Sequence, residues 1–410
     1  MISKLLQNIN YKKIENIFNL CGGTTPLTTK KEYWNGDILW ATPTDITKLN
    51  NSYLLKDTKK KITDKAVQDN ALKLIEPGTL LMSSRASIGW TIIPDKKVTI
   101  NQGITALIPK NQNEIHVLFY YYYFRFIRNL LNSLASGSTF KEISKSTLRN
   151  LHIPIPPLPT QKKIAVILST ADSAIQKVDE AIEKTHRLKK GVMHRLLTKG
   201  IGHTEFKDTE IGRIPKEWEV MRLKEVASIR GNRINKKLDE YAFIPMELLP
   251  ENELFAKYLI KGKQDIKSYT YCESGDVLLA KITPSLENGK QGIVPEDIPE
   301  KVALATTEVF PIQCENIYNG FLFYILKMAK YRNVLITSMI GTTGRQRASK
   351  DVLEKLNIPV PSLREQKRIF EILQTIDKRL ESLNSKKQKL QRIKQGLMNE
   401  LLTGKKVNSK

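Results

Sequence analysis

Two stretches of the chain place hydrophobic residues at every seventh position, with a second ladder four residues behind the first and charged residues between them. This spacing is typical of a helix that packs along another helix. The stretches predict helices over residues 158–200 and 363–403. We expect their seam to consist of Ile164, Leu168, Ile175, Val178 and Ile182 from the first helix and Ile369, Leu373, Ile376, Leu380, Leu383 and Leu390 from the second. The seam should be imperfect, because polar residues interrupt both ladders, namely Thr185, Lys189, Lys387 and Lys394.

The two helical stretches are copies of one another. Residues 153–198 align with residues 358–403 at an offset of 205, with 19 identities in 46 positions. One copy opens with "IPIPPLPTQKKI" and the other with "IPVPSLREQKRI", and both close with "LLT". Proline fixes its own backbone and restricts the residue before it. Such a segment therefore fixes the direction in which the chain leaves the domain and allows little flexibility where the helix begins. The chain therefore carries an internal duplication.

A more variable part precedes each helix, and both parts mix short strand-like runs with one strongly apolar helix. The predicted fold class is mixed α+β, with two similar globular domains, an internal pseudo-two-fold repeat and two long helices that form an antiparallel coiled coil. The alternative is that each helix packs only on its own domain. We expect the first domain at 1–157, the central helix at 158–200, a connector at 201–217, the second domain at 218–362, the C-terminal helix at 363–403 and a tail at 404–410.

The charge of the chain indicates its partner. A formal net charge of +24 over 410 residues concentrates polyanions around the protein, and nucleic acid is the commonest polyanion that such chains bind. A lysine-rich proteome is the alternative explanation. The three cysteines are widely separated, which fits neither a disulfide framework nor a zinc site and favours a reducing cytoplasm. No secretory signal and no apolar run of membrane-spanning length is evident.

Loops rich in small polar and basic residues are the candidates for DNA contact. Arg, Lys, Asn and Gln can read base edges, whereas Ser, Thr and glycine amides bind phosphates. The loops just before the two helices, "SGSTFKE" and "GTTGRQR", occupy equivalent places and differ in chemistry, as two readers of different sequences should. For any single residue, an ordinary solvated loop remains the alternative. The candidate DNA-binding residues are Ser83, Ser84, Arg85, Gln102, Ser138, Thr139 and Lys141 in the first domain, and Lys281, Thr283, Asn288, Lys290, Thr306, Thr307, Thr343, Arg345, Gln346 and Arg347 in the second.

The aromatic run "FYYYYFRF" could be a stacking platform for bases, but we interpret it as the core of a helix. The second half has "FLFYILKM" at the matching place, so the shared property is hydrophobicity. Consecutive residues of a helix also point in different directions, which does not make a single stacking face.

Signatures of catalysis are missing. The chain has no phosphate-binding loop, no dinucleotide fingerprint and no metalloprotease motif, and none of its five histidines has a partner at metal-ligand spacing. We therefore expect no catalytic residue and no metal site.

The whole pattern resembles the DNA-specificity subunit of Type I restriction-modification systems. The resemblance is carried by the paired helix openings, the paired helix ends "LKKGVMHRLLT" and "IKQGLMNELLT", and the connector "FKDTEIGRIPKEWEVMRL". Inside the domains, "YWNGDILWATPTDI" and "GDVLLAKITPSLENGKQGIV" are also similar to family patterns.

The resemblance implies two target-recognition domains, each reading one half of a split, asymmetric site in double-stranded DNA. It implies that the helix pair sets the spacer and docks two modification (methyltransferase) subunits, and that restriction (helicase-nuclease) subunits join them. It also implies a non-catalytic, cytoplasmic chain without a cofactor, with S-adenosylmethionine, ATP and Mg on the partner subunits. The alternative is a stand-alone DNA-binding or coiled-coil scaffold protein without methylase partners; an enzyme in its own right is less favoured.

Overall fold

The computed structural model describes residues 10–49, 52–137, 141–232, 237–342 and 344–403. The chain forms two compact units. The first unit contains Met1–Ala181 together with Asn384–Lys410, and the second contains Ile182–Leu383. Each unit therefore combines one globular domain with part of both long helices, α7 (Leu158–Lys199) and α12 (Leu363–Thr403).

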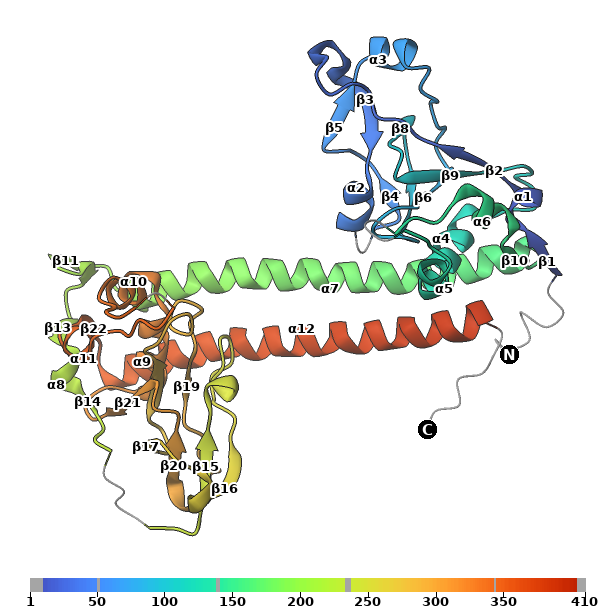
Figure 1. The fold of residues 1–410 in the computed structure, drawn as a ribbon. Coiled ribbons are helices and arrows are strands. Elements are labelled where there is room, and N and C mark those ends of the chain that lie inside the picture. Colours follow the sequence, from blue (N-terminus) through green and yellow to red (C-terminus); the bar gives the residue numbers. More distant parts are fainter. Residues whose placement is uncertain (1–9, 50–51, 138–140, 233–236, 343, 404–410) are drawn as a thin grey trace. The chain divides into compact units, whose positions relative to one another are not determined.

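The domain of the first unit is built on two sheets (Figure 1). The larger sheet has the strand order β2-β9-β6-β7-β4 and is antiparallel except where β4 joins β7. The smaller has the order β5-β3-β8, and a separate pair, β1-β10, brings the start of the domain beside the start of α7. The strands are β1 (Asn10–Lys13), β2 (Phe18–Gly22), β3 (Trp34–Ala41), β4 (Leu54–Leu55), β5 (Lys60–Ile62), β6 (Leu80–Ser83), β7 (Thr91–Pro94), β8 (Val98–Ile100), β9 (Ile104–Pro109) and β10 (His152–Ile155).

Helix α4 fills the space between the larger sheet and α7 (Figure 1). Its aromatic run is buried from Phe119 to Phe124, and these rings pack with Leu80 and Leu107 of the sheet in one core. The prediction of a helix core is confirmed. The helices of this domain are α1 (Ile14–Ile17), η2 (Lys31–Tyr33), α2 (Pro43–Lys48), α3 (Asp64–Asp69), α4 (Val117–Phe126), α5 (Arg128–Ser133) and α6 (Lys145–Asn150).

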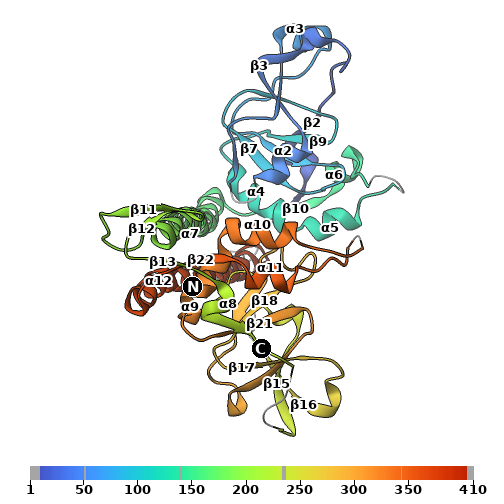
Figure 2. The ribbon, with the colours of Figure 1, turned by 90° about the vertical axis from the view of Figure 1, so that its left-hand side faces the viewer.

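The domain of the second unit repeats this plan. One sheet has the order β14-β21-β18-β19 and the other has the order β16-β15-β20-β17. Figure 2 shows β15 and β16 at the end of the domain away from α12. The pair β13-β22 takes the place of β1-β10. The strands are β13 (Glu219–Arg222), β14 (Ala227–Ile229), β15 (Glu240–Ile244), β16 (Leu259–Gly262), β17 (Thr270–Glu273), β18 (Val277–Ala280), β19 (Gln291–Ile293), β20 (Val302–Ala305), β21 (Val309–Cys314) and β22 (Asn357–Val360); the helices are α8 (Leu223–Val226), η3 (Met246–Leu248), η4 (Lys263–Asp265), η5 (Pro299–Lys301), α9 (Asn319–Lys327), α10 (Ala329–Thr337) and α11 (Lys350–Glu354).

The segment between α7 and the second domain is ordered. It forms the hairpin β11 (Phe206–Thr209) and β12 (Gly212–Pro215), which the sequence did not predict. The Glu365 carboxylate at the start of α12 accepts hydrogen bonds from the Trp218 indole at 3.0 Å and from the Ile201 amide at 2.9 Å. The connector is thereby fixed to the start of the second long helix.

Each domain core contains the start of one long helix and the end of the other. Ile164 and Leu168 of α7 lie in the first core together with Leu401 and Leu402 of α12. The second core contains Ile369 and Leu373 of α12 together with Leu196 and Leu197 of α7. The alternative in which each helix packs only on its own domain is therefore wrong. The remaining predicted seam residues are buried or half-buried.

Ion pairs between α7 and α12 show their direction. In the first unit Asp172 pairs with Lys394, and seven residues further along α7 Asp179 pairs with Lys387 at 2.6 Å. Because the numbers rise along one helix and fall along the other, the helices are antiparallel. In the second unit Lys189 pairs with Asp377. The predicted fold class, two α+β domains with two long packed helices, is confirmed. The lysines that interrupt the hydrophobic ladders are the partners of these aspartates.

A tyrosine completes two of these ion pairs. The Tyr122 hydroxyl on α4 donates to Asp172 at 2.7 Å, and the Tyr324 hydroxyl on α9 donates to Asp377 at 2.6 Å. Burial and the neighbouring carboxylate raise the pKa of both tyrosines far above the ordinary value, so both remain protonated donors. We call these sets the first triad (Tyr122, Asp172, Lys394) and the second triad (Tyr324, Asp377, Lys189). Each triad connects a domain core to both helices.

A buried glutamine fixes each proline-rich joint. The Gln161 side chain accepts from the His116 amide at 2.8 Å and donates to the Pro156 carbonyl at 2.8 Å. Gln366 makes the equivalent contacts, accepting from the Tyr318 amide at 2.7 Å and donating to the Pro361 carbonyl at 2.8 Å. The prolines limit the direction of the chain, and the glutamine holds the helix start against its own domain.

Candidate nucleic-acid interface

Three loops of the first domain meet at one place. We call residues 83–87, 101–103, 136–137 and 141–142 the first loop cluster. Main-chain hydrogen bonds join the loops: the Ser84 amide donates to the Gly103 carbonyl at 2.9 Å, and the Ala86 amide donates to the Lys141 carbonyl at 3.1 Å. The Ile143 amide closes the set by donating to the Ser84 carbonyl at 3.0 Å. The structure thus brings together the three loops that the sequence predicted separately.

Three loops of the second domain are joined in the same way. We call residues 281–290, 306–308, 340–342 and 344–347 the second loop cluster. The Lys281 amide donates to the Glu308 carbonyl at 3.0 Å, and the Thr283 amide donates to the Gln346 carbonyl at 3.0 Å. The Ala348 amide donates to the Lys281 carbonyl at 2.8 Å. These three bonds match those of the first cluster one for one, so the two domains share a main-chain frame.

An arginine-glutamate pair joins two loops in each cluster, and the two pairs join different loops. In the first cluster Arg85 of the first loop donates through Nε and Nη2 to Glu142 of the third loop, at 3.0 and 2.6 Å. In the second cluster Arg347 of the third loop donates to Glu308 of the second loop, at 2.8 and 2.6 Å. The guanidinium beside Glu308 lowers the pKa of that carboxyl. The equivalent position of the third loop therefore carries Glu142 in one domain and Arg347 in the other, which have opposite charges.

Several of the predicted residues are exposed at these clusters and available to a ligand. Gln102, Lys141, Thr307, Arg345 and Arg347 have exposed side chains. Others are partly covered: Arg85, Lys281, Thr283, Thr306 and Gln346. Burial lowers the pKa of Lys281, whose ammonium lies 5.5 Å from the centre of the Phe310 ring.

A few predicted residues belong to the clusters but are buried, bonded to other parts of the domain or remote from the other loops. Ser83 and Ser84 are buried, and the Ser83 hydroxyl accepts from the Trp90 amide at 3.1 Å, so both serines support the loop from within. The Lys290 ammonium donates to the Met246 carbonyl at 2.7 Å, while Asn288 is exposed at the far end of its loop. The remaining candidates, Ser138, Thr139 and Thr343, lie outside the described residues.

Sequence reasoning did not single out three residues that the structure places in the clusters. Glu142 and Glu308 hold the arginines, and only the fold reveals that they do so. Ile340 begins the third loop of the second domain and is 78% exposed. The Ile340 amide donates to the Arg347 carbonyl and the Arg347 amide donates to the Ile340 carbonyl, both at 3.0 Å. An apolar side chain beside an arginine suits contact with a thymine methyl group.

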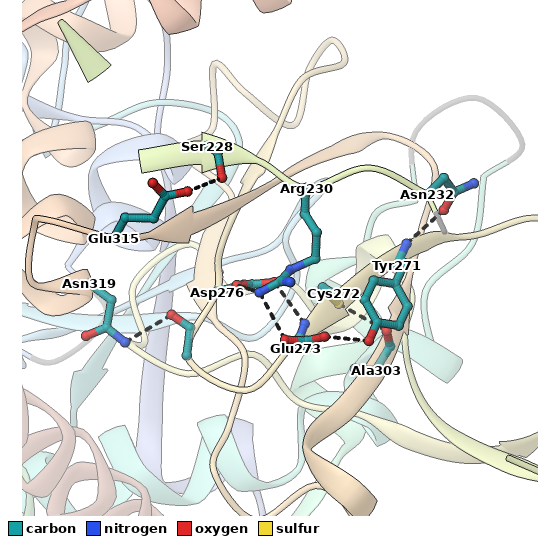
Figure 3. A network of polar contacts seen from close by, with 11 residues as sticks. Ser228, Arg230, Asn232, Tyr271, Cys272, Glu273, Asp276, Ala303, Glu315 and Asn319 are labelled. Carbon is teal, nitrogen blue, oxygen red and sulfur yellow. Dashed lines mark hydrogen bonds and ion pairs between the residues drawn. The ribbon is translucent and has the colours of Figure 1, made fainter. Parts of the chain in front are cut away.

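A second polar network supports the second domain only (Figure 3). The Arg230 guanidinium at the end of β14 donates to both carboxylate oxygens of Asp276, at 2.7 and 2.9 Å, and lies 3.2 Å from Glu273. Asp276 is 3% exposed, and burial raises the pKa of its carboxyl even though Arg230 opposes that shift. At the matching positions of the first domain the chain has Cys21 and Thr79, which carry no such charges.

Within the described ranges, no group of three or more histidine, cysteine, aspartate and glutamate side chains is placed to hold a metal ion. Of the helices that the structure describes, none is long and apolar enough to cross a membrane. The two loop clusters are polar surfaces that each carry at least one arginine, and they lie on similar scaffolds.

Comparison with known proteins gives the family. A model for the Type I restriction modification DNA specificity domain matches the chain twice, over residues 7–184 and 215–392. The chain is 32% identical over 365 residues to the MjaVIII specificity subunit of Methanocaldococcus jannaschii, covering 84% of this chain and 81% of that one, and 29% identical over 433 residues to the MjaIX subunit, covering 98% and 94%. The fold matches the crystal structure of a Type I restriction-modification S subunit from M. genitalium with a TM-score of 0.56 at 18% identity, covering 97% of both chains. The chain therefore belongs to the DNA specificity subunits of Type I restriction-modification systems, as a non-catalytic subunit with two target-recognition domains.

Proposed function

We propose that the two loop clusters read the two halves of a split, asymmetric DNA site. One observation carries this proposal: the clusters share their main-chain frame and differ in their side chains. A common frame presents each domain to DNA in the same way, while different side chains select different bases. The net charge of +24 supports attraction to the duplex.

In this proposal the length of the helix pair sets the spacer between the two half-sites. Its support is the exchange of helix ends between the domain cores and the two triads, which fix each domain to both helices. The same helices would dock two modification subunits, with restriction subunits joining the complex. S-adenosylmethionine, ATP and Mg would be bound by those partners, in a cytoplasmic assembly.

Insertion of one heptad into both helices tests whether the helix pair sets the spacer. We would add seven residues after Ala181 and seven after Leu383, which keeps the antiparallel seam in phase. The helices lengthen by about 10 Å, so the spacer between half-sites should grow by about three base pairs. The measurement is the map of methylated adenines in DNA treated with the complex reconstituted from this chain and its modification subunits.

The unmodified chain and a one-helix insertion are the controls. The unmodified complex should methylate a site with two defined halves and a fixed spacer. Both half-site sequences should stay the same in the insertion variant. If the spacer stayed the same with a longer helix pair, the proposal that the helices set the spacer would be contradicted. A single continuous site would contradict the proposal that the two domains each read one half-site.

A further inference from the structure

We infer that Arg85 and Arg347 are the residues that read a guanine in the first and second half-sites, and that Glu142 and Glu308 are positioning residues that hold them. This inference rests on the proposed function, and it assigns particular side chains to base recognition. Four features of the clusters carry it: the edge of each guanidinium that faces the carboxylate, the exposure of the guanidinium, its place among the main-chain bonds that join the loops, and the different loops that the pair joins in the two domains.

Both arginines use the same edge of the guanidinium to bind the glutamate. In both pairs Nε and Nη2 face the carboxylate. Among the residues that the structure describes, none bonds to Nη1 of either arginine. The Nη1–Nη2 end of a guanidinium has the geometry to donate two hydrogen bonds to O6 and N7 of guanine, the commonest specific contact in the major groove. A glutamate on the other edge leaves this end available.

Both arginines are accessible and yet held in place. Their side chains are 42% and 50% exposed. A free arginine loses rotamer freedom when it binds, and fixing it beforehand reduces that loss. The glutamate also partly neutralises the guanidinium, which weakens its attraction to phosphate relative to a neutral base edge.

The place of the pair in the frame argues against a purely structural role. An exposed ion pair contributes little to stability, about 0–1 kcal/mol. The main-chain bonds between the loops already join the same segments in both clusters. An arginine-glutamate pair is present in both clusters but joins different loops in each, which is better explained by the position of the arginine. It lies on the first loop in one domain and on the third loop in the other, so the guanine should occupy different positions in the two half-sites.

Charge-swap variants test the inference. In R85E/E142R and in R347E/E308R the ion pair can still form, but the arginine moves to another loop. We expect each swap to reduce discrimination for guanine at one position of its own half-site roughly 10- to 100-fold. The other half-site should be unchanged. The measurement is methylation of a library with randomised half-sites by the reconstituted complex, with urea unfolding of each variant to show that the fold persists.

Two further variants sharpen the result. E142Q keeps the arginine and weakens its support, so the preference for guanine should persist with a smaller ratio. The swap K97E/E76K reverses an exposed ion pair elsewhere in the first domain and should change neither half-site. A folded R85E/E142R complex with the same first half-site as the unmodified complex would overturn the inference. An unmodified complex without a split site would instead overturn the proposed function, and this inference with it.

Discussion

The two loop clusters differ where the two triads agree. In the clusters, main-chain bonds are shared while the arginine and the glutamate lie on different loops in the two domains. In the triads, the tyrosine, the aspartate and the lysine are the same on both sides. The duplicated chain has therefore kept the chemistry that attaches domains to helices and changed the chemistry on the surface. Attachment and recognition are separable in this molecule, because they use different side chains on one scaffold.

The interior of the two domains also differs in one place. Arg230 and Asp276 form a buried ion pair in the second domain, where the first has Cys21 and Thr79. The same strand positions thus hold charge in one copy and none in the other. We expect this difference to change the response of the two domains to pH.

Removal of the shared aspartate should have the largest effect on stability. D377A leaves the Tyr324 hydroxyl and the Lys189 ammonium without their carboxylate in a mostly buried site. Loss of one partner of a buried ion pair costs about 3–5 kcal/mol, so we expect the second unit to lose about 4 kcal/mol of unfolding free energy. D172A should destabilise the first unit by a similar amount. Hydrogen exchange, resolved by segment, measures both.

Asp179 provides the matched control. It pairs with Lys387 on the same helices, but its carboxylate and that ammonium are 26% and 33% exposed. D179A should cost about 1 kcal/mol or less. Equal losses for D377A and D179A would show that the triads are ordinary seam ion pairs, and the contrast between attachment and recognition would then lose its physical basis.

Removal of Arg230 should have a smaller and pH-dependent effect. R230M leaves Asp276 buried and unpaired, which we expect to cost about 3 kcal/mol at pH 8. Without the guanidinium the pKa of Asp276, already raised by burial, rises further above its unfolded value. The folded state then holds a proton that the unfolded state releases. Stability falls as the pH rises from about 4 through the folded pKa, and urea unfolding at pH 5 and pH 8 measures it.

The residue types at the matching positions of the first domain provide a second test of this interpretation. R230C/D276T installs the residue types of Cys21 and Thr79 and removes both charges together. Replacing both partners of a buried ion pair is often close to neutral, so this variant should recover most of the stability and lose the added pH dependence. A double variant as unstable as R230M would contradict the interpretation, since the loss would then come from packing and not from an uncompensated carboxylate.

Local patterns in the sequence predicted much of the fold. The seven-residue period predicted both helices, and the repeat predicted two similar domains. The seam lysines were interpreted only as interruptions, because the partner of Lys394 lies 222 residues away at Asp172. The same limit applies to Glu142 and Glu308, whose role depends on loops that meet only in the folded domain. Ser83 and Ser84 have the composition of contact residues, and only their burial separates them from exposed neighbours.

The central claim is that the two domains share one scaffold and recognise their half-sites independently of each other. The domains can be exchanged at equivalent points, because the Ile14 amide donates to the Leu151 carbonyl at 2.9 Å and the Leu223 amide donates to the Leu356 carbonyl at 2.9 Å. A chain with residues 14–151 in place of 223–356 should direct methylation to a site with two copies of the first half-site. Mapping of methylated adenines measures this directly. Retention of the original second half-site in that chain would contradict the account.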